Sequence, residues 1–123
     1  MNSYEKLHAW KAAHDLVLLV YRATRTFPTE ERYGLTSQLR RAAFGVAANI
    51  AEGSAKKGPR EFRRFLDIAV ASMAELTYTL RLAQDLELIA EALQVELEKQ
   101  RDLTSRLTWR LYAAVRRLAT RTG

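Results

Sequence analysis

The sequence predicts an all-α protein: an antiparallel up-down-up-down four-helix bundle in which residues 1–123 form a single domain. Residues that favour turns are scarce, because the 123 residues include only 5 Gly and 2 Pro. Apolar residues recur at three- and four-residue steps through four segments that short connections join. A hydrophobic fraction of 48% and a charged fraction of 28% are typical of a globular domain with one core.

The first helix is predicted from Glu5 to Thr26. Pro28 sets its end, because a proline pushes the residue before it out of the helical region of backbone space. The apolar face of this helix follows helical spacing through Trp10, Ala13, Val17, Val20 and Thr24. A polar connection is expected over residues 29–34.

The second helix is the predicted centre of the architecture, with a start signal at Thr36 and a natural left-handed cap at Gly53. Its apolar face carries Leu35, Leu39, Ala42, Ala43, Val46 and Ile50. The other sides are polar or small, and such a helix is usually buried on more than one side. In so short a chain this pattern indicates the middle of a bundle or a contact between subunits.

One side of the second helix faces away from Leu39 and Val46, and it carries Phe44, Ala47 and Ala51. Small residues at such positions allow a neighbouring backbone or helix to approach closely. We therefore expect these three residues to lie in an interface between subunits of a closed ring.

The third helix is predicted from Pro59, which fits a first helical turn, to Leu88. Its apolar face carries Phe62, Phe65, Leu66, Ala69, Met73, Leu76, Leu80 and Ala83. The fourth helix is predicted from Glu91 to Thr120. Its apolar face carries Leu93, Leu97, Thr104, Leu107, Leu111, Val115 and Leu118.

Charge is unevenly distributed along the chain, whose formal net charge is +6 and whose pI is about 10.0. In an up-down bundle the start of the third helix lies beside the end of the fourth, so their basic residues gather at one end. This basic pole consists of Lys56, Lys57, Arg60, Arg63, Arg64, Arg106, Arg110, Arg116, Arg117 and Arg121. The opposite end is expected to be acidic, with Glu30, Glu31, Asp85, Glu87, Glu91, Glu96 and Glu98. A basic surface of this kind suits a nucleic-acid partner, RNA or DNA.

Trp109 lies among the arginines of the fourth helix, roughly opposite Leu107 and Leu111 on the helical wheel. A tryptophan on a basic face suits either a subunit interface or stacking on exposed bases. We prefer the interface and keep base stacking as the alternative.

Glu75, in the middle of the third helix, has two interpretations. Its carboxylate could act as a general acid or base. Alternatively it pairs with Arg41 or Asn49 across the bundle as a buried, hydrogen-bonded group. No nucleophile and no phosphate-binding glycine loop supports catalysis, so we interpret Arg41, Asn49, Glu52 and Glu75 as structural polar residues.

Several classes of site find no support in the sequence. The chain has no Cys, which rules out disulfides, thiolate nucleophiles and thiolate metal ligands. Its one Glu-x-x-His spacing, Glu5 to His8, is half of what a di-iron bundle needs, so we expect no metal and no cofactor. Without a signal peptide or an apolar run of about 18 residues, we expect a cytoplasmic protein with no membrane partner.

Two runs, Tyr33–Ala43 and Asn49-Ile50-Ala51-Glu52-Gly53, resemble a known family. It comprises the small four-helix-bundle proteins encoded in intervening sequences of bacterial 23S ribosomal RNA genes. The resemblance spans roughly residues 7–89. Further matches are Trp10-Lys11-Ala12, Phe27-Pro28, Glu61-Phe62, Phe65-Leu66, Ser72 and Glu75-Leu76.

The resemblance implies an up-down bundle that assembles as a homopentamer and is not an enzyme. It also implies a distant similarity to the accessory variability determinant of diversity-generating retroelements, a pentameric barrel that binds nucleic acid and a reverse transcriptase. Our leading hypothesis is a cytoplasmic, non-enzymatic homo-oligomer that binds nucleic acid through its basic pole. The alternative is an oligomeric scaffold or adaptor for a protein partner, with no nucleic-acid role.

Overall fold

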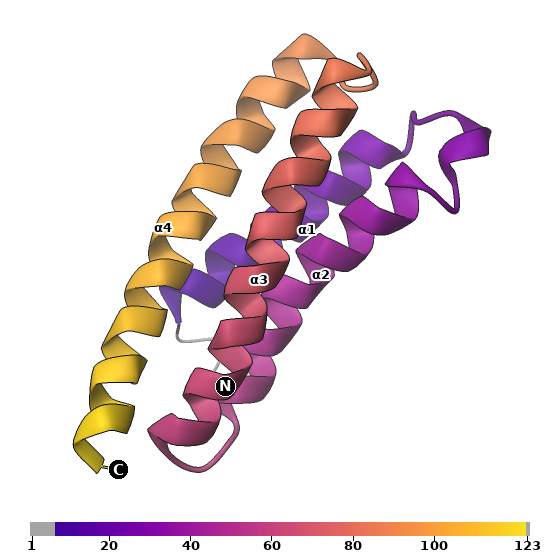
Figure 1. The fold of residues 1–123 in the computed structure, drawn as a ribbon. Coiled ribbons are helices and arrows are strands. Elements are labelled where there is room, and N and C mark those ends of the chain that lie inside the picture. Colours follow the sequence, from indigo (N-terminus) through magenta and orange to yellow (C-terminus); the bar gives the residue numbers. More distant parts are fainter. Residues whose placement is uncertain (1–6, 123) are drawn as a thin grey trace.

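The computed structural model describes residues 7–122, and these residues form helices and connections without a strand (Figure 1). A short 3₁₀ helix, η2 (Thr29–Glu31), lies in the first connection. The long helices are α1 (His8–Thr24), α2 (Leu35–Ser54), α3 (Gly58–Asp85) and α4 (Glu91–Thr122). The prediction of an all-α, four-helix protein is confirmed. Within the described range, no helix combines the length and the apolar character needed to cross a membrane.

The four helices pack in a cycle, each against its neighbours in the chain and α4 against α1, whereas the backbones of the diagonal pairs, α1 with α3 and α2 with α4, do not approach closely. Figure 1 shows the chain reversing direction at each connection. Side chains set the register between the first and last helices: the Gln100 amide donates to the Ala12 carbonyl over 3.0 Å, and Arg22 lies 3.9 Å from Glu96.

The predicted apolar face of α2 is confirmed, because each of its residues is buried. Most of the predicted α3 face is buried as well, with Phe62 half-buried at its first turn. In α1 the predicted face is displaced: Trp10 and Val17 are only half-buried, while Leu16 and Ala23 are buried. The core of the bundle therefore centres on α2, which packs against both α1 and α3.

The last turns of α4 differ from the prediction. Leu118 is 49% exposed, whereas Tyr112 and Ala119 are buried. The reason is the limited reach of α1, whose first residues lie level with Leu107 and Leu111. Beyond that level α4 buries the side that faces α3, so its apolar stripe rotates away from the predicted one.

Gly53 does not cap α2, as the sequence had suggested. The helix continues through it to Ser54. A Cβ atom at position 53 would lie 2.8 Å from the Cβ of Phe65 and 2.9 Å from a ring carbon of Phe62. At position 53, α3 approaches the backbone of α2 so closely that only glycine, which has no side chain, fits.

The end of α3 comes three residues before the predicted Leu88. Glu87 adopts the left-handed conformation, with φ 59°. The Leu88 N–H donates to the Ala83 carbonyl over 3.0 Å, and the Glu87 N–H donates to the Gln84 carbonyl over 2.9 Å. These two bonds satisfy the last carbonyls of the helix and turn the chain toward α4.

The other helix limits differ from the predicted ones by small amounts. The predicted start of the first helix, Glu5, lies outside the described residues. Its end is at Thr24, and the Thr24 carbonyl accepts from the Phe27 N–H over 3.2 Å as the chain turns away. At the start of α2, the Leu35 N–H donates to the Glu31 side chain over 3.2 Å. That bond satisfies one of the free donors of a first helical turn.

Candidate functional site

The basic pole forms where α3 begins and α4 ends, the two helix ends at the bottom of Figure 1. Two grooves fix this arrangement. One joins Met73 of α3 to Trp109 of α4, and the other joins Gln84 to Arg101. The later residues of α3 thus lie beside the earlier residues of α4, and the first turns of α3 lie level with the last turns of α4.

The ten predicted basic residues all reach the surface. Arg63 is half-buried, and the other nine are exposed. Eight of them come from the α2–α3 connection, the first turns of α3 and the last turns of α4, so the fold brings together two segments that are far apart in sequence. Arg106 and Arg110 adjoin Ser105 and Trp109, which line a hollow with residues from the middle of α3, so these two arginines lie midway along the bundle rather than at its end.

Arg64 is the member of the basic pole with the strongest partner. Its Nε donates to Glu61 over 2.9 Å. This hydrogen bond, followed by the charge of the guanidinium, lowers the pKa of Glu61 and raises that of Arg64. The Arg64 guanidinium also lies 4.7 Å from the ring centre of Phe65, whose ring has Lys56 at 5.4 Å. Part of the positive charge of the basic pole, that of Arg64, is therefore neutralised by Glu61.

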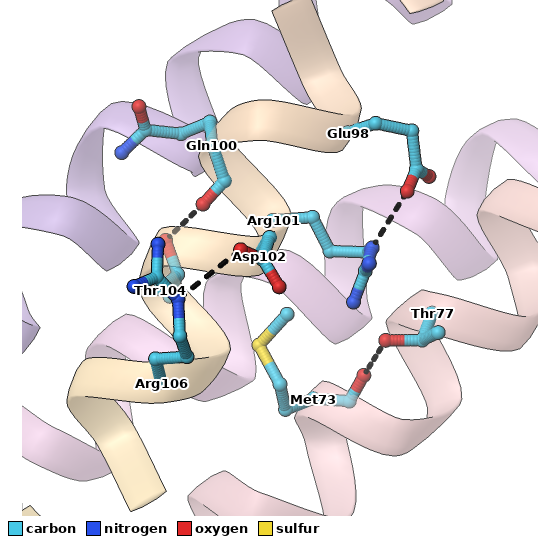
Figure 2. A network of polar contacts seen from close by, with 8 residues as sticks. All are labelled: Met73, Thr77, Glu98, Gln100, Arg101, Asp102, Thr104 and Arg106. Atoms are coloured by element: carbon cyan, nitrogen blue, oxygen red, sulfur yellow. Dashed lines mark hydrogen bonds and ion pairs between the residues drawn. The ribbon is translucent and has the colours of Figure 1, made fainter. Parts of the chain in front are cut away.

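Charge on α4 is balanced in its first half and unbalanced in its second. Figure 2 shows Arg101 beside Glu98 and Arg106 beside Asp102, with Nε–oxygen distances of 3.2 Å and 3.1 Å. No acidic residue follows Asp102 in the sequence. The exposed arginines from Arg110 to Arg121 therefore have no acid of α4 within two turns of them.

The opposite end of the molecule is not the acidic pole that the sequence suggested. Its carboxylates alternate with the arginines Arg22, Arg25, Arg32, Arg81 and Arg101. Arg81 lies 3.1 Å from Asp85, and Arg22 lies 3.9 Å from Glu96. The protein is thus basic at one end and mixed in charge at the other.

The predicted buried pairing of Glu75 with Arg41 or Asn49 is wrong. Its side chain is exposed on α3 and does not form the buried pair with Arg41 or Asn49. Arg41 and Glu52 are exposed as well, while the Asn49 amide donates to the Gly45 carbonyl of its own helix over 2.7 Å. Over residues 7–122, no group of three or more His, Asp or Glu side chains is arranged to hold a metal ion.

The predicted interface residues lie in different environments. Phe44 is 62% exposed and Trp109 is 55% exposed, which are large values for aromatic side chains. Ala51 is half-buried. Ala47 is only 8% exposed and belongs to the core of the protomer, so it offers little surface to a neighbour.

A family model described as 23S rRNA-intervening sequence protein matches residues 5–110, which is most of the chain. The chain belongs to this family. No curated protein matches the sequence. Arg116, Arg117 and Arg121 lie beyond the matched residues of the 23S rRNA-intervening sequence family, so part of the basic pole is outside the region that defines membership.

The groove beside Trp109 is a feature that the sequence did not reveal in this member of the family. It lies between α3 and α4, has a volume of about 210 Å³, and has Val70 and Met73 in its lining. Ala74 and Thr77 also line a second hollow of about 530 Å³, so the two hollows lie next to each other along α3 and α4. Periodicity identifies residues that face the core. It does not identify the places where short side chains on two helices leave a space.

Proposed function

We propose that this member of the family is a non-enzymatic homo-oligomer that binds nucleic acid through its basic pole. The observation that carries the proposal is the clustering of exposed Lys and Arg side chains from α3 and α4 at one end of the bundle. In a closed ring, all copies are related by rotation about one axis. If the helices run roughly along that axis, every basic pole lies on the same face.

Such a face should bind the phosphate backbone rather than particular bases. Neutralising phosphates releases their counterions, so affinity falls steeply and linearly with salt on logarithmic axes. Phosphate contacts fix the position of the protein but read little sequence. RNA and DNA are both candidate ligands, and we propose a pentameric, cytoplasmic assembly because the family resemblance implies it.

The test is a salt titration of binding to labelled single-stranded and duplex RNA and DNA. We compare the wild type with a triple variant, Arg60→Ala, Arg63→Ala and Arg64→Ala. The variant should bind more weakly to every probe, and its slope should be shallower by about one for each phosphate that the variant no longer neutralises. The matched control removes the same charge from the other end by Arg22→Ala, Arg25→Ala and Arg32→Ala, and it should retain affinity.

A second candidate function is an oligomeric scaffold for a protein partner. The exposed aromatic side chains of Phe44 and Trp109 favour it, because large apolar groups are concentrated at protein contacts. Failure of the wild type to bind any of the four probes at about 50 mM salt would eliminate the nucleic-acid function and leave the scaffold.

A further inference from the structure

Two outer faces of the bundle carry apolar groups that the protomer does not cover. The first is formed by α1 and α2 and is dominated by Phe44, which is 62% exposed. Ala51 follows Phe44 by seven residues and therefore lies on the same side of α2. On α1, Tyr21 is 40% exposed, and its ring lies under the Arg40 guanidinium at 4.4 Å. The face therefore presents one protruding aromatic ring among smaller groups.

The second face is the depression between α3 and α4. Its floor is open because Ala74, Thr77 and Ser105 have short side chains, while Trp109 forms a wall. The indole lies 5.4 Å from the Tyr112 ring, centre to centre, at an interplanar angle of 36°. Figure 2 shows Met73 and Thr77 of α3 on the side that faces α4. A hollow of about 210 Å³ with this lining suits one apolar side chain.

The protrusion and the hollow lie on different sides of the protomer. The backbones of α2 and α4 do not approach closely, because these two helices lie diagonally across the bundle, and the exposed Phe44 is on the outer side of α2 while the hollow needs both α3 and α4. Phe44 therefore cannot reach the hollow of its own chain. A contact between two different surfaces of identical subunits is heterologous, and repeating it gives a ring when the rotation closes.

We infer that Phe44 of one copy inserts into the α3–α4 hollow of the next copy. The inference rests on the proposed homo-oligomer and names its contact. A second copy is the occupant we choose because the same chain supplies both the apolar protrusion and an apolar hollow. One pair of charges near the contact is complementary, since exposed Arg41 lies one turn before Phe44 and exposed Asp67 lies one turn before Val70 on the α3 side of the hollow. The arginines Arg106 and Arg110 flank Trp109 on the α4 side.

Two variants test each side of this contact separately. Phe44→Asp removes the protrusion, and Ala74→Trp fills the hollow. Both positions are exposed, so each protomer should keep its helical circular dichroism. Each variant should have the mass of a single 14.1 kDa copy in light scattering at a concentration where the wild type is an oligomer. Tyr33→Asp, at a side chain that is 88% exposed in the α1–α2 connection, is the matched control and should remain an oligomer.

Mixing the two variants gives the sharper result. The Phe44→Asp copy keeps an intact hollow and the Ala74→Trp copy keeps an intact protrusion, so one contact forms and the mixture stops at a heterodimer of about 28 kDa, two copies of 14.1 kDa. If either single variant keeps the wild-type mass, or if the mixture shows no heterodimer, the inference is overturned while the oligomer stands. A monomeric wild type would overturn the oligomer itself.

Discussion

Thr108 is buried, and its hydroxyl has no hydrogen-bond partner among residues 7–122. Other buried threonines on the helices donate their hydroxyl to a backbone carbonyl one turn earlier. The Thr104 hydroxyl donates to the Gln100 carbonyl over 2.7 Å, and the Thr79 hydroxyl donates to the Glu75 carbonyl over 2.7 Å. A buried hydroxyl without a partner costs free energy, because it loses water and gains nothing in return.

Replacing Thr108 with Val should therefore raise the free energy of unfolding by about 1 kcal/mol, since it removes the unpaired hydroxyl and keeps the shape of the side chain. Thr104→Val is the matched control. It removes a satisfied hydroxyl at a fully buried position and should lower stability by about 1 kcal/mol. Urea denaturation of the two variants measures both changes, and equal effects of the same sign would contradict this account.

Glu61 reduces the positive charge of the basic pole, because its carboxylate pairs with Arg64. Its pKa is lowered from 4.5 by the hydrogen bond from Arg64 and by that guanidinium's charge, so the carboxylate stays ionised throughout the neutral range. A lowered pKa in the folded state means that the pair stabilises the protein above the ordinary pKa. This contribution is lost as the pH falls through the lowered value. The pair is fully exposed, so its main effect is on the local charge.

Glu61→Gln should consequently tighten binding of a single-stranded RNA probe at pH 7, because it frees the charge of Arg64. Glu91→Gln, an equal charge change at the other end of the bundle, should leave the affinity unchanged. Fluorescence anisotropy measures both. The wild type should approach the affinity of Glu61→Gln only when the pH falls below 4.5. Identical affinities of the two variants at pH 7 would show that the face containing Glu61 does not meet the probe.

At the scale of the elements, two glycines of α2, Gly45 and Gly53, face α3 and allow the two helices to approach closely, but their surroundings differ. A Cβ atom at Gly53 would meet the Cβ of Phe65 at 2.8 Å, which is close to the backbone and cannot move aside. A Cβ at Gly45 would meet the Ser72 hydroxyl at 2.8 Å, the end of a side chain that can rotate, and the Ser72 Cβ at 3.3 Å, which is a milder contact than the one at Gly53.

Gly53→Ala should lower the free energy of unfolding by about 1–3 kcal/mol, because overpacking forces α3 away from α2. Gly45→Ala should be neutral or stabilising, since alanine favours a helix over glycine by about 1 kcal/mol and Ser72 can yield. Thermal unfolding of the two variants measures the difference. A gain in stability for Gly53→Ala would mean that the close approach of the helices is not required.

Most of the fold could be predicted from the sequence, because an apolar stripe at helical spacing must be buried somewhere. The face of α2 is the clearest example. The errors arose where tertiary contacts override local signals. Gly53 looks like a helix cap but serves close packing, and Leu118 continues a stripe whose partner helix does not extend that far.

The candidate site was predicted unevenly for a related reason. The position of a basic residue along the bundle follows from topology and a list of charges, which predicted the grouping of the residues near the start of α3 with Arg116, Arg117 and Arg121 but assigned Arg106 and Arg110 to the end of the bundle rather than to its middle. The pairing of Glu75 with Arg41 or Asn49 required knowledge of which sides of α2 and α3 meet, and a pattern within one helix does not contain that information. The hollow beside Trp109 depends in the same way on two helices at once.

At the scale of the whole molecule, an uneven charge distribution and two apolar side faces act together. One protomer has a basic pole and an end of mixed charge, and it has two apolar faces at its sides. Contacts at the sides leave both ends free. Assembly would thus place the basic poles together on one face, where their potentials add and attract a polyanion that a single copy would bind weakly.

The most direct test is the mass of the complex with one labelled single-stranded oligonucleotide at low salt, measured by mass photometry or analytical ultracentrifugation. The account predicts a single oligonucleotide on a closed assembly of about 70 kDa, five copies of 14.1 kDa each. A complex in which each 14.1 kDa copy carries its own oligonucleotide, or a closed assembly that binds none, would contradict it.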